Sequence, residues 1–292
     1  MSTSPPRVAS LLPSATEIVR ALGLEAALVA VSHSCDFPGR VETLPRATGT
    51  RVPPGAGSRE IDEIVRDCLR QGESLYRLDQ ALLERLRPDV IVTQSLCEVC
   101  AVGASEVERA VPTLGARPAV ITLAPRTLEE VFDSILVVGQ ALWRTAEAAA
   151  LVRTLRHRVD AVRMRAGLRR HRPRVAFLEW ADPPISGGHW NPELVELAGG
   201  RDGLGSPGRR SRSLAWEEVV AWRPEVMVLA CCGFDEARGL EELDRLRRRR
   251  GFGDLPCARS GRVHVMDGVR LFSRPGPSLV DSLERLSAVL GD

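Results

Sequence analysis

Short apolar runs rich in β-branched residues recur along the chain, separated by longer stretches whose apolar positions repeat every three or four residues. Two of these runs occur with similar preceding residues in both halves of the chain: Arg7-Val8-Ala9-Ser10-Leu11 returns as Arg174-Val175-Ala176-Phe177-Leu178, and Arg87-Pro88-Asp89-Val90-Ile91-Val92 returns as Arg223-Pro224-Glu225-Val226-Met227-Val228. Runs of this kind are typical of buried parallel strands, and their alternation with helices predicts βα units. The repetition therefore predicts an α/β protein of two Rossmann-like lobes, each with a parallel sheet.

The pattern places the expected elements along both lobes. We expect strands over 8–11, 28–32, 90–93 and 119–123 in the first lobe, and over 174–178, 226–229 and 263–266 in the second. We expect helices over 61–71, 78–86, 216–222 and 278–290, and a first helix that ends near Gly23. For that first helix, Ser14 and Glu17 have the spacing of a capping box.

The region from Thr127 to about His171 is expected to be almost entirely helical, with Thr127 as a helix cap. Its second part, roughly 25 residues, would measure about 40 Å at about 1.5 Å per residue, which is long enough to connect two lobes rigidly. The sequence thus predicts an N-terminal lobe over 1–125, connecting helices over 126–172 and a C-terminal lobe over 173–292. Open α/β sheets bind ligands at the carboxyl ends of their strands, so we expect a ligand crevice between the lobes.

Composition narrows the classes of function. The 292 residues carry a net charge of only +2, which does not favour a nucleic-acid partner. No apolar run is long enough to insert into a membrane. The first residues show no export signal, so we expect a cytoplasmic location. In a reducing cytosol the seven cysteines are expected to be thiols or ligands rather than disulfides.

Chemically active side chains follow the expected strands. His33 and Cys35 follow one strand, and Cys97, Glu98 and Cys100 follow another. In the second lobe the corresponding positions hold Glu179, Trp180 and Cys232. The predicted topology brings these groups together at the crevice.

The Cys97-x-x-Cys100 pair has three interpretations. It could hold zinc or an iron-sulfur cluster, with Cys35 and either His33 or Cys232 completing a set of four ligands. It could be a redox dithiol, or two cysteines that serve as small apolar side chains. The first two interpretations lead to a cytoplasmic enzyme or redox protein, in which Glu98 or Glu179 would transfer protons.

A glycine-rich loop carries two further candidates, His189 and Trp190, in Gly187-Gly188-His189-Trp190-Asn191-Pro192. An aromatic side chain in such a loop suits a flat ligand, because its ring gives a large contact area at little entropic cost. Trp190 could equally pack over the helix that follows. Both alternatives stay open.

Several longer motifs resemble the substrate-binding proteins of cobalamin and iron-chelate import systems, in the variant without an export signal. They cover nearly the whole chain, from about Arg7 to Leu290. The motifs that carry the resemblance are Ser10-Leu11-Leu12-Pro13-Ser14-Ala15-Thr16-Glu17, Val31-Ser32-His33-Ser34-Cys35-Asp36-Phe37-Pro38, Leu96-Cys97-Glu98-Val99-Cys100-Ala101-Val102, Gly188-His189-Trp190-Asn191-Pro192-Glu193-Leu194 and Arg274-Pro275-Gly276-Pro277-Ser278-Leu279-Val280-Asp281-Ser282.

The resemblance implies a protein that binds cobalamin, or a related metal chelate, between its lobes and is not an enzyme. The ligand-binding residues expected on this basis are Ser14, His33, Tyr76, Glu98, Glu179, Trp180, His189, Trp190, Phe272 and Arg274. In the family, one surface glutamate per lobe docks onto arginines of an ABC permease. Glu217, and more loosely Glu106, occupy the corresponding positions, although a cytoplasmic protein would not meet such a permease.

Overall fold

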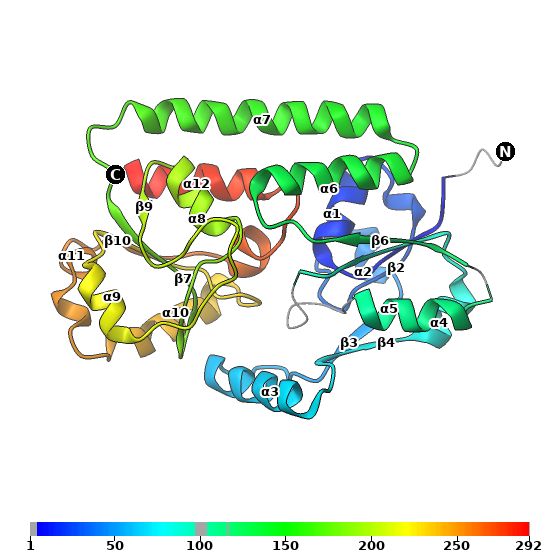
Figure 1. The fold of residues 1–292 in the computed structure, drawn as a ribbon, viewed down its shortest axis with the longest axis horizontal. Helices are drawn as coiled ribbons and strands as arrows, with labels where there is room; N and C mark the ends of the chain where they lie inside the picture. The colour runs from blue at the N-terminus through cyan, green and yellow to red at the C-terminus, as the bar shows by residue number, and fades with distance from the viewer. Residues whose placement is uncertain (1–4, 97–103, 116, 292) are drawn as a thin grey trace. The chain divides into compact units, whose positions relative to one another are not determined.

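The computed structural model describes residues 5–96, 104–115 and 117–291. It divides into two compact units (Figure 1). Unit 1 comprises Met1–Pro125 and Phe132–Val152, and unit 2 comprises Arg126–Val131 and Arg153–Asp292. No helix within the described ranges is both long and apolar enough to cross a bilayer.

Unit 1 is built on a four-stranded sheet in the order β2-β1-β5-β6, and all of its pairs are parallel. Its strands are β1 (Val8–Ser10), β2 (Leu28–Val31), β5 (Val90–Gln94) and β6 (Ala119–Leu123). Ala9, Ala30 and Ile91 on neighbouring strands lie in one buried cluster. A separate antiparallel hairpin joins β3 (Thr48–Thr50) to β4 (Tyr76–Leu78).

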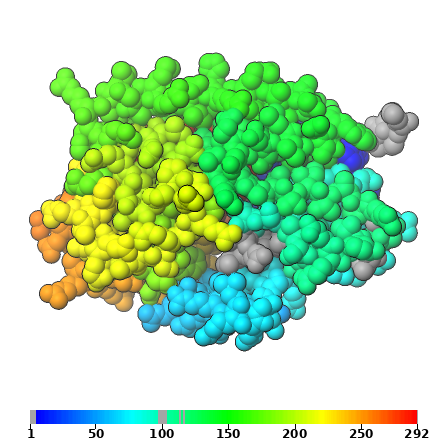
Figure 2. Space-filling model, in the orientation of Figure 1, coloured from blue at the N-terminus to red at the C-terminus, as the bar shows by residue number. Residues whose placement is uncertain are grey.

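The helices of unit 1 follow the strands as the βα pattern predicts. They are α1 (Pro13–Ala21), α2 (Arg40–Thr43), α3 (Ser58–Gln71), α4 (Gln80–Leu86) and α5 (Ala104–Ala110), with short 3-10 turns at Glu25–Ala27 and Val111–Thr113. Helix α3 lies at the surface beside the hairpin, where its side chains are seen in cyan (Figure 2).

Unit 2 is built on a five-stranded sheet whose path is β11-β10-β7-β8, with β9 paired to β7. Its strands are β7 (Arg174–Ala181), β8 (Pro184–Ser186), β9 (Arg201–Asp202), β10 (Val226–Leu229) and β11 (Val263–Val265). The pairs are parallel except β7–β8, which is an antiparallel hairpin. This sheet is therefore mixed rather than purely parallel, because β7 continues beyond the predicted end at Leu178 and turns back as β8.

Short helices surround the second sheet. They are α8 (Asn191–Leu197), α9 (Trp216–Trp222), α10 (Glu236–Arg247), α11 (Pro256–Arg259) and α12 (Leu279–Gly291), with a 3-10 turn at Phe252–Asp254 and a π-helical turn at Gly268–Phe272. Helix α12 contacts α8, and the side chains of Leu283 and Leu286 are completely buried.

The predicted long helical region is confirmed. It consists of α6 (Leu128–Ala141) and the 23-residue helix α7 (Thr145–Gly167). Thr127 caps α6, because its Oγ1 accepts a hydrogen bond from the Glu130 N–H at 3.3 Å. Along α7, Leu155 and Val162 are buried and Leu151 and Val159 are half-buried, as the spacing of these residues predicts.

The two repeated sequence motifs form the same local structure in both units. The Arg7 N–H donates to Asp89 Oδ2 at 2.7 Å, and the Arg174 N–H donates to Glu225 Oε2 at 3.0 Å. Arg87 and Arg223 both end a helix in the left-handed conformation, with φ of 44° and 49°. The repetition thus encodes how a helix passes into a strand and how that strand joins its neighbour.

Two details of the predicted helices are wrong. Helix α1 begins at Pro13 with Leu12 as N-cap, so Ser14 and Glu17 do not form a capping box. Proline suits the first helical position because its missing N–H would have no intrahelical partner there. Leu78 belongs to β4, and α4 begins after Asp79, whose carboxylate accepts from the Leu82 N–H at 2.8 Å.

Candidate functional site

In unit 1 a polar network lies at the carboxyl end of β2, around His33. The His33 N–H donates to Thr48 Oγ1 at 3.0 Å, and His33 Nδ1 lies 2.7 Å from the same hydroxyl. Ser34 Oγ lies 3.0 Å from His33 Nε2. The ring of Tyr76 stands 5.4 Å from the imidazole, centroid to centroid. The β3–β4 hairpin therefore brings two predicted ligand-binding residues, His33 and Tyr76, into contact.

The electrostatic setting keeps His33 neutral near pH 7. Burial lowers the pKa of the imidazole, and the nearby Arg46 guanidinium lowers it further. Arg46 is itself fixed by the carbonyl oxygens of Ser32 at 3.2 Å and Cys35 at 2.9 Å. A neutral imidazole retains a ring nitrogen that can accept a hydrogen bond or bind a metal.

A second set of hydroxyls lies between β1 and the start of α1. Thr16 Oγ1 donates to Ser10 Oγ at 2.8 Å and lies 3.2 Å from Cys35 Sγ. Ser14, a predicted ligand-binding residue, is buried, and its Oγ has no hydrogen-bond partner among the described residues. Buried hydroxyls in native proteins are normally paired, so the Ser14 hydroxyl is an unused polar group at this strand end.

The cysteine site predicted from the sequence remains a prediction. Cys35 is buried in unit 1, and Cys97, Glu98 and Cys100 lie outside the described residues. Where the structure does describe the chain, no three His, Cys, Asp or Glu side chains group as metal ligands. In unit 2, Cys231 is buried and its pKa is raised, first by burial and then by Glu242, whereas Cys232 is half-buried.

In unit 2 the carboxylate of Glu179 organises the loop that follows the β7–β8 hairpin. Glu179 Oε2 accepts from the Gly188 N–H and from Asn191 Nδ2, both at 3.2 Å. Burial raises the pKa of this carboxyl group, while bonds from Ser211, Gly188 and Asn191 oppose the rise. Glu179 lies within β7 rather than beyond it, because the strand runs to Ala181.

His189 occupies a strained position in this loop. Its φ of 54° is left-handed, a conformation that non-glycine residues rarely adopt. Its N–H donates to the Arg209 carbonyl at 2.6 Å, and its own carbonyl accepts from the Gly208 N–H at 2.9 Å. The Nε2 atom is buried without a hydrogen-bond partner in the described part of the chain. Burial lowers the pKa of the imidazole, and Arg210 and Arg126 lower it further.

Gly187 and Gly188 allow this loop to pack closely. A Cβ on Gly188 would lie 2.3 Å from the backbone nitrogen of Ser211, and one on Gly187 would lie 2.8 Å from the Phe177 ring. Both approaches are shorter than any real Cβ contact, so only glycine fits at either position. Gly188 thus lets the 208–211 segment pack against the His189 loop, and Gly187 lets the loop pack against Phe177.

The predicted aromatic contacts lie in the interior of unit 2. Trp190 is 4% exposed, and its Nε1 donates to the Phe272 carbonyl at 2.9 Å. The Phe272 ring packs edge-on against Phe177 at 5.0 Å, and Trp180 lies 5.1 Å from Phe234. Arg274 is also buried. These positions give each side chain a packing role, and their predicted contact with a ligand stays a prediction.

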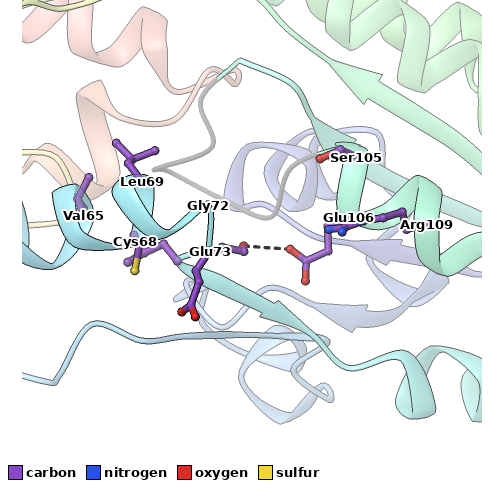
Figure 3. A pocket seen from close by; sticks show the side chains of 10 residues that line it. Val65, Cys68, Leu69, Gly72, Glu73, Ser105, Glu106 and Arg109 are labelled. Carbon is purple, nitrogen blue, oxygen red and sulfur yellow. Dashed lines mark hydrogen bonds between the residues drawn. The ribbon is translucent and has the colours of Figure 1, made fainter.

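Glu106 lines a pocket of about 250 Å³ in unit 1 (Figure 3). Its Oε2 accepts from Ser74 Oγ at 3.1 Å, and Arg109 lies on the same helix, α5. Val65, Cys68, Leu69 and Leu75 form the apolar part of the lining. Glu217 is exposed in the first turn of α9. The predicted permease-docking roles of Glu106 and Glu217 are not tested by these positions.

Several polar residues at the two strand ends are missing from the predicted set: Thr16, Arg46 and Thr48 in unit 1, and Arg126, Asn191, Arg210 and Ser211 in unit 2. Thr16 and Asn191 lie inside the motifs of the sequence resemblance, so these motifs could have indicated them as site residues. Thr48, Arg126 and Arg210 lie in segments distant along the chain, and only the folded hairpin and loop bring them to the histidines.

Comparison with known proteins identifies the family. The family model for periplasmic binding proteins matches residues 8–269. No curated protein matches the sequence significantly. Similar solved structures include a possible iron-binding, periplasmic solute-binding protein of Staphylococcus epidermidis (19% identity, 99% of each chain, TM-score 0.74) and the periplasmic heme-binding protein RhuT of Roseiflexus (23%, 98% of each chain, TM-score 0.73).

Another similar structure is the periplasmic vitamin B12 binding protein BtuF of Vibrio cholerae, with 20% identity over 98% of this chain and 97% of that chain and a TM-score of 0.70. At these identities the structures show a shared fold and not a shared ligand. The family model, by contrast, spans most of the sequence and agrees with the family-level prediction from its motifs. The chain therefore belongs to the periplasmic binding protein family.

Proposed function

We propose that this protein binds a metal chelate, a metal ion already held by a flat macrocycle of the haem or corrinoid type. Membership of the periplasmic binding protein family supports a binding function. Proteins of the same fold are described as binding heme, vitamin B12 or iron. Cobalamin is the ligand that the sequence resemblance implies, and haem is the other chelate that these neighbours suggest.

The observation that carries the proposal is the unpartnered ring nitrogen of His189. Its lowered pKa keeps the imidazole neutral at pH 7, and a neutral imidazole has one ring nitrogen whose lone pair can bind a metal. One imidazole supplies a single donor. This suits a metal whose remaining positions are filled by a macrocycle, because only an axial position then needs a protein ligand.

Backbone strain and close packing both hold this imidazole in its position. The left-handed φ of His189, the two glycines before it and the Glu179 hydrogen bonds all act on the same loop. Strained residues persist where the surrounding structure fixes them, and they cluster at ligand sites.

The experiment is a titration of the purified apoprotein with haemin and with cyanocobalamin, followed by absorption and by tryptophan fluorescence. Saturable one-to-one binding of either chelate at micromolar concentration or tighter is the expected result. His189→Asn should change the absorption spectrum of the bound metal, since asparagine tolerates the left-handed conformation but lacks the imidazole. The matched control is His157→Asn on the exposed face of α7.

Two results would contradict the proposal. One is the absence of binding for both chelates. The other is a brown, iron-containing protein after purification without oxygen that loses its colour in Cys97→Ser, which would support the cluster-containing enzyme instead.

Docking of this protein onto an ABC permease depends on the cellular compartment in which the protein lies. Docking of Glu217 onto an ABC permease requires export, and the cytoplasmic location that we propose would prevent it. Fractionation of cells that express the protein from its native gene separates these alternatives: recovery with cytoplasmic markers excludes permease docking, and recovery outside the cytoplasm excludes the cytoplasmic location.

A further inference from the structure

The His189 loop is surrounded by arginines that belong to unit 2. The 208–211 segment packs on the loop, with the Arg209 carbonyl bonded to the His189 N–H and Gly188 closely packed on Ser211. Arg126 precedes Thr127, whose Cγ2 is 3.6 Å from the position of a Cβ on Gly208. Two separate segments of the chain, at 126–127 and at 208–211, thus lie close together beside the His189 loop, and the positive charges of Arg210 and Arg126 both lower the pKa of its imidazole after burial.

These guanidinium groups have no acidic partner in the described ranges. Arg126 and Arg210 are exposed, and neither forms an ion pair with a carboxylate there, whereas Arg212 pairs with Glu218 at 2.8 Å. The nearby carboxylates are occupied by backbone N–H groups: Glu130 accepts from Arg126 N–H, and Glu193 accepts from Leu128 N–H. Glu179 is held by Gly188 and Asn191.

This arrangement disfavours a bare metal cation beside His189, because two guanidinium charges without an ion-pair partner in the described ranges would repel it. It favours a ligand that brings negative charge. Arginine binds carboxylates with paired, charge-assisted hydrogen bonds.

We propose that Arg126 and Arg210 bind an ionised carboxylate carried by the ligand, so that the chelate is of the carboxylate-bearing, haem-like class rather than a cobalamin, whose ring carries neutral amides and whose one peripheral anion is a phosphodiester. This inference rests on the proposed function, since it names the class of chelate bound at the His189 loop. The recognition is electrostatic and directional, so it distinguishes a carboxylate from its ester.

The test compares haemin, haemin dimethyl ester and cyanocobalamin as ligands of the unmodified protein. The ester keeps the metal and the macrocycle but removes both negative charges. We expect haemin to bind about tenfold or more tightly than the ester, because charge-assisted hydrogen bonds of this kind change affinity by at least that factor. We also expect cyanocobalamin to bind more weakly than haemin.

The double variant Arg126→Gln/Arg210→Gln should remove most of this preference by weakening haemin binding while leaving ester binding nearly unchanged. The matched control, Arg248→Gln/Arg250→Gln, removes the same charge from exposed positions at the end of α10 and should alter haemin affinity by less than about twofold. Thermal unfolding of both variants verifies that they are folded.

The outcomes separate this inference from the function on which it rests. Equal affinity for haemin and its ester, or tighter binding of cyanocobalamin than of haemin, overturns the inference and leaves the proposed function standing. A preference for haemin that survives unchanged in the Arg126/Arg210 variant also overturns it. Binding of none of the three ligands overturns both.

Discussion

The two units are alike at the amino-terminal ends of their strands and differ at the carboxyl-terminal ends. At the amino-terminal ends of the strands, Arg7 with Asp89 in unit 1 and Arg174 with Glu225 in unit 2 make equivalent bonds between neighbouring strands. Arg7 also donates to the Leu86 carbonyl, and Arg174 to the Arg223 carbonyl. These contacts stabilise the scaffold and carry no ligand chemistry.

At the carboxyl-terminal ends the units diverge. Strand β1 is three residues long and leads directly into α1, whereas β7 is eight residues long and continues through the β8 hairpin into the His189 loop. Unit 1 positions its histidine with hydroxyl groups, and unit 2 positions its histidine with a buried carboxylate, two glycines and a strained backbone. The same scaffold thus supports two different functional edges, as expected where parallel strands end.

The largest effect should come from the packing of the unit 2 loop. Gly188→Ala forces a Cβ against the backbone of Ser211, which cannot move aside, so we expect unfolding of unit 2 to become easier by about 3 kcal/mol. Gly49→Ala in unit 1 is the matched control, because a Cβ there meets nothing within 4 Å. Hydrogen exchange read separately for each unit provides the measurement. A similar loss of unfolding free energy in Gly188→Ala and Gly49→Ala would contradict the expected difference between the carboxyl-terminal strand ends of the two units.

The next effect concerns the Glu179 carboxylate. Glu179→Ala leaves the Gly188 N–H and the Asn191 amide without their acceptor, so we expect a loss of about 2 kcal/mol and faster exchange over 187–191. Glu179→Gln retains an acceptor oxygen and should lose less. If the alanine variant keeps the protection of the Gly188 amide, the carboxylate does not organise this loop.

The equivalent scaffold bonds should give smaller effects that are similar in the two units. We expect Asp89→Ala to cost about 1 kcal/mol and Glu225→Ala slightly more, because Glu225 also accepts from His171 Nε2 at 2.8 Å. Glu84→Ala, on the exposed face of α4, is the control. Urea denaturation measures the three free energies. A cost confined to one unit would contradict the structural equivalence of the repeated motifs.

The smallest effect is a shared dependence on pH. Burial lowers the pKa of both His33 and His189, so the unfolded chain binds more protons than the folded chain below the ordinary histidine pKa of about 6.5. Stability should therefore be complete above about pH 6.5 and decline as the pH falls toward the lowered values. Acid sensitivity should diminish in His33→Asn and in His189→Asn, but not in His157→Asn, when unfolding is measured at pH 7.5 and 5.5.

Much of the scaffold was predictable because its signals are local. Apolar runs marked β1, β5, β7 and β10, and helical periodicity marked α6 and α7. The hairpins were not predicted: β3, β4 and β8 are short, and their pairing depends on contacts between distant segments. The predicted capping box of Ser14 and Glu17 was wrong because Pro13 directly precedes Ser14. Proline favours the first helical position, so the sequence offered two possible helix starts and the helix begins at Pro13.

The same distinction between local and distant signals applies to the candidate site. His33, Glu179 and His189 were named from the sequence because they follow predicted strands or stand in distinctive motifs, and Tyr76 was named only through the family resemblance. Their partners Thr48, Arg126 and Arg210 were not, because no pattern in the sequence links them to the histidines. Trp190 had two interpretations, and only the structure supplies its hydrogen bond to the Phe272 carbonyl.

The sequence alone determined the family, the α/β class and the twofold repetition of the scaffold, since these depend on periodicity and on short motifs read in order. The tertiary structure decided how each histidine is held and which charges surround it. Burial and electrostatic fields arise from residues far apart in the chain that folding brings within a few ångströms of one another.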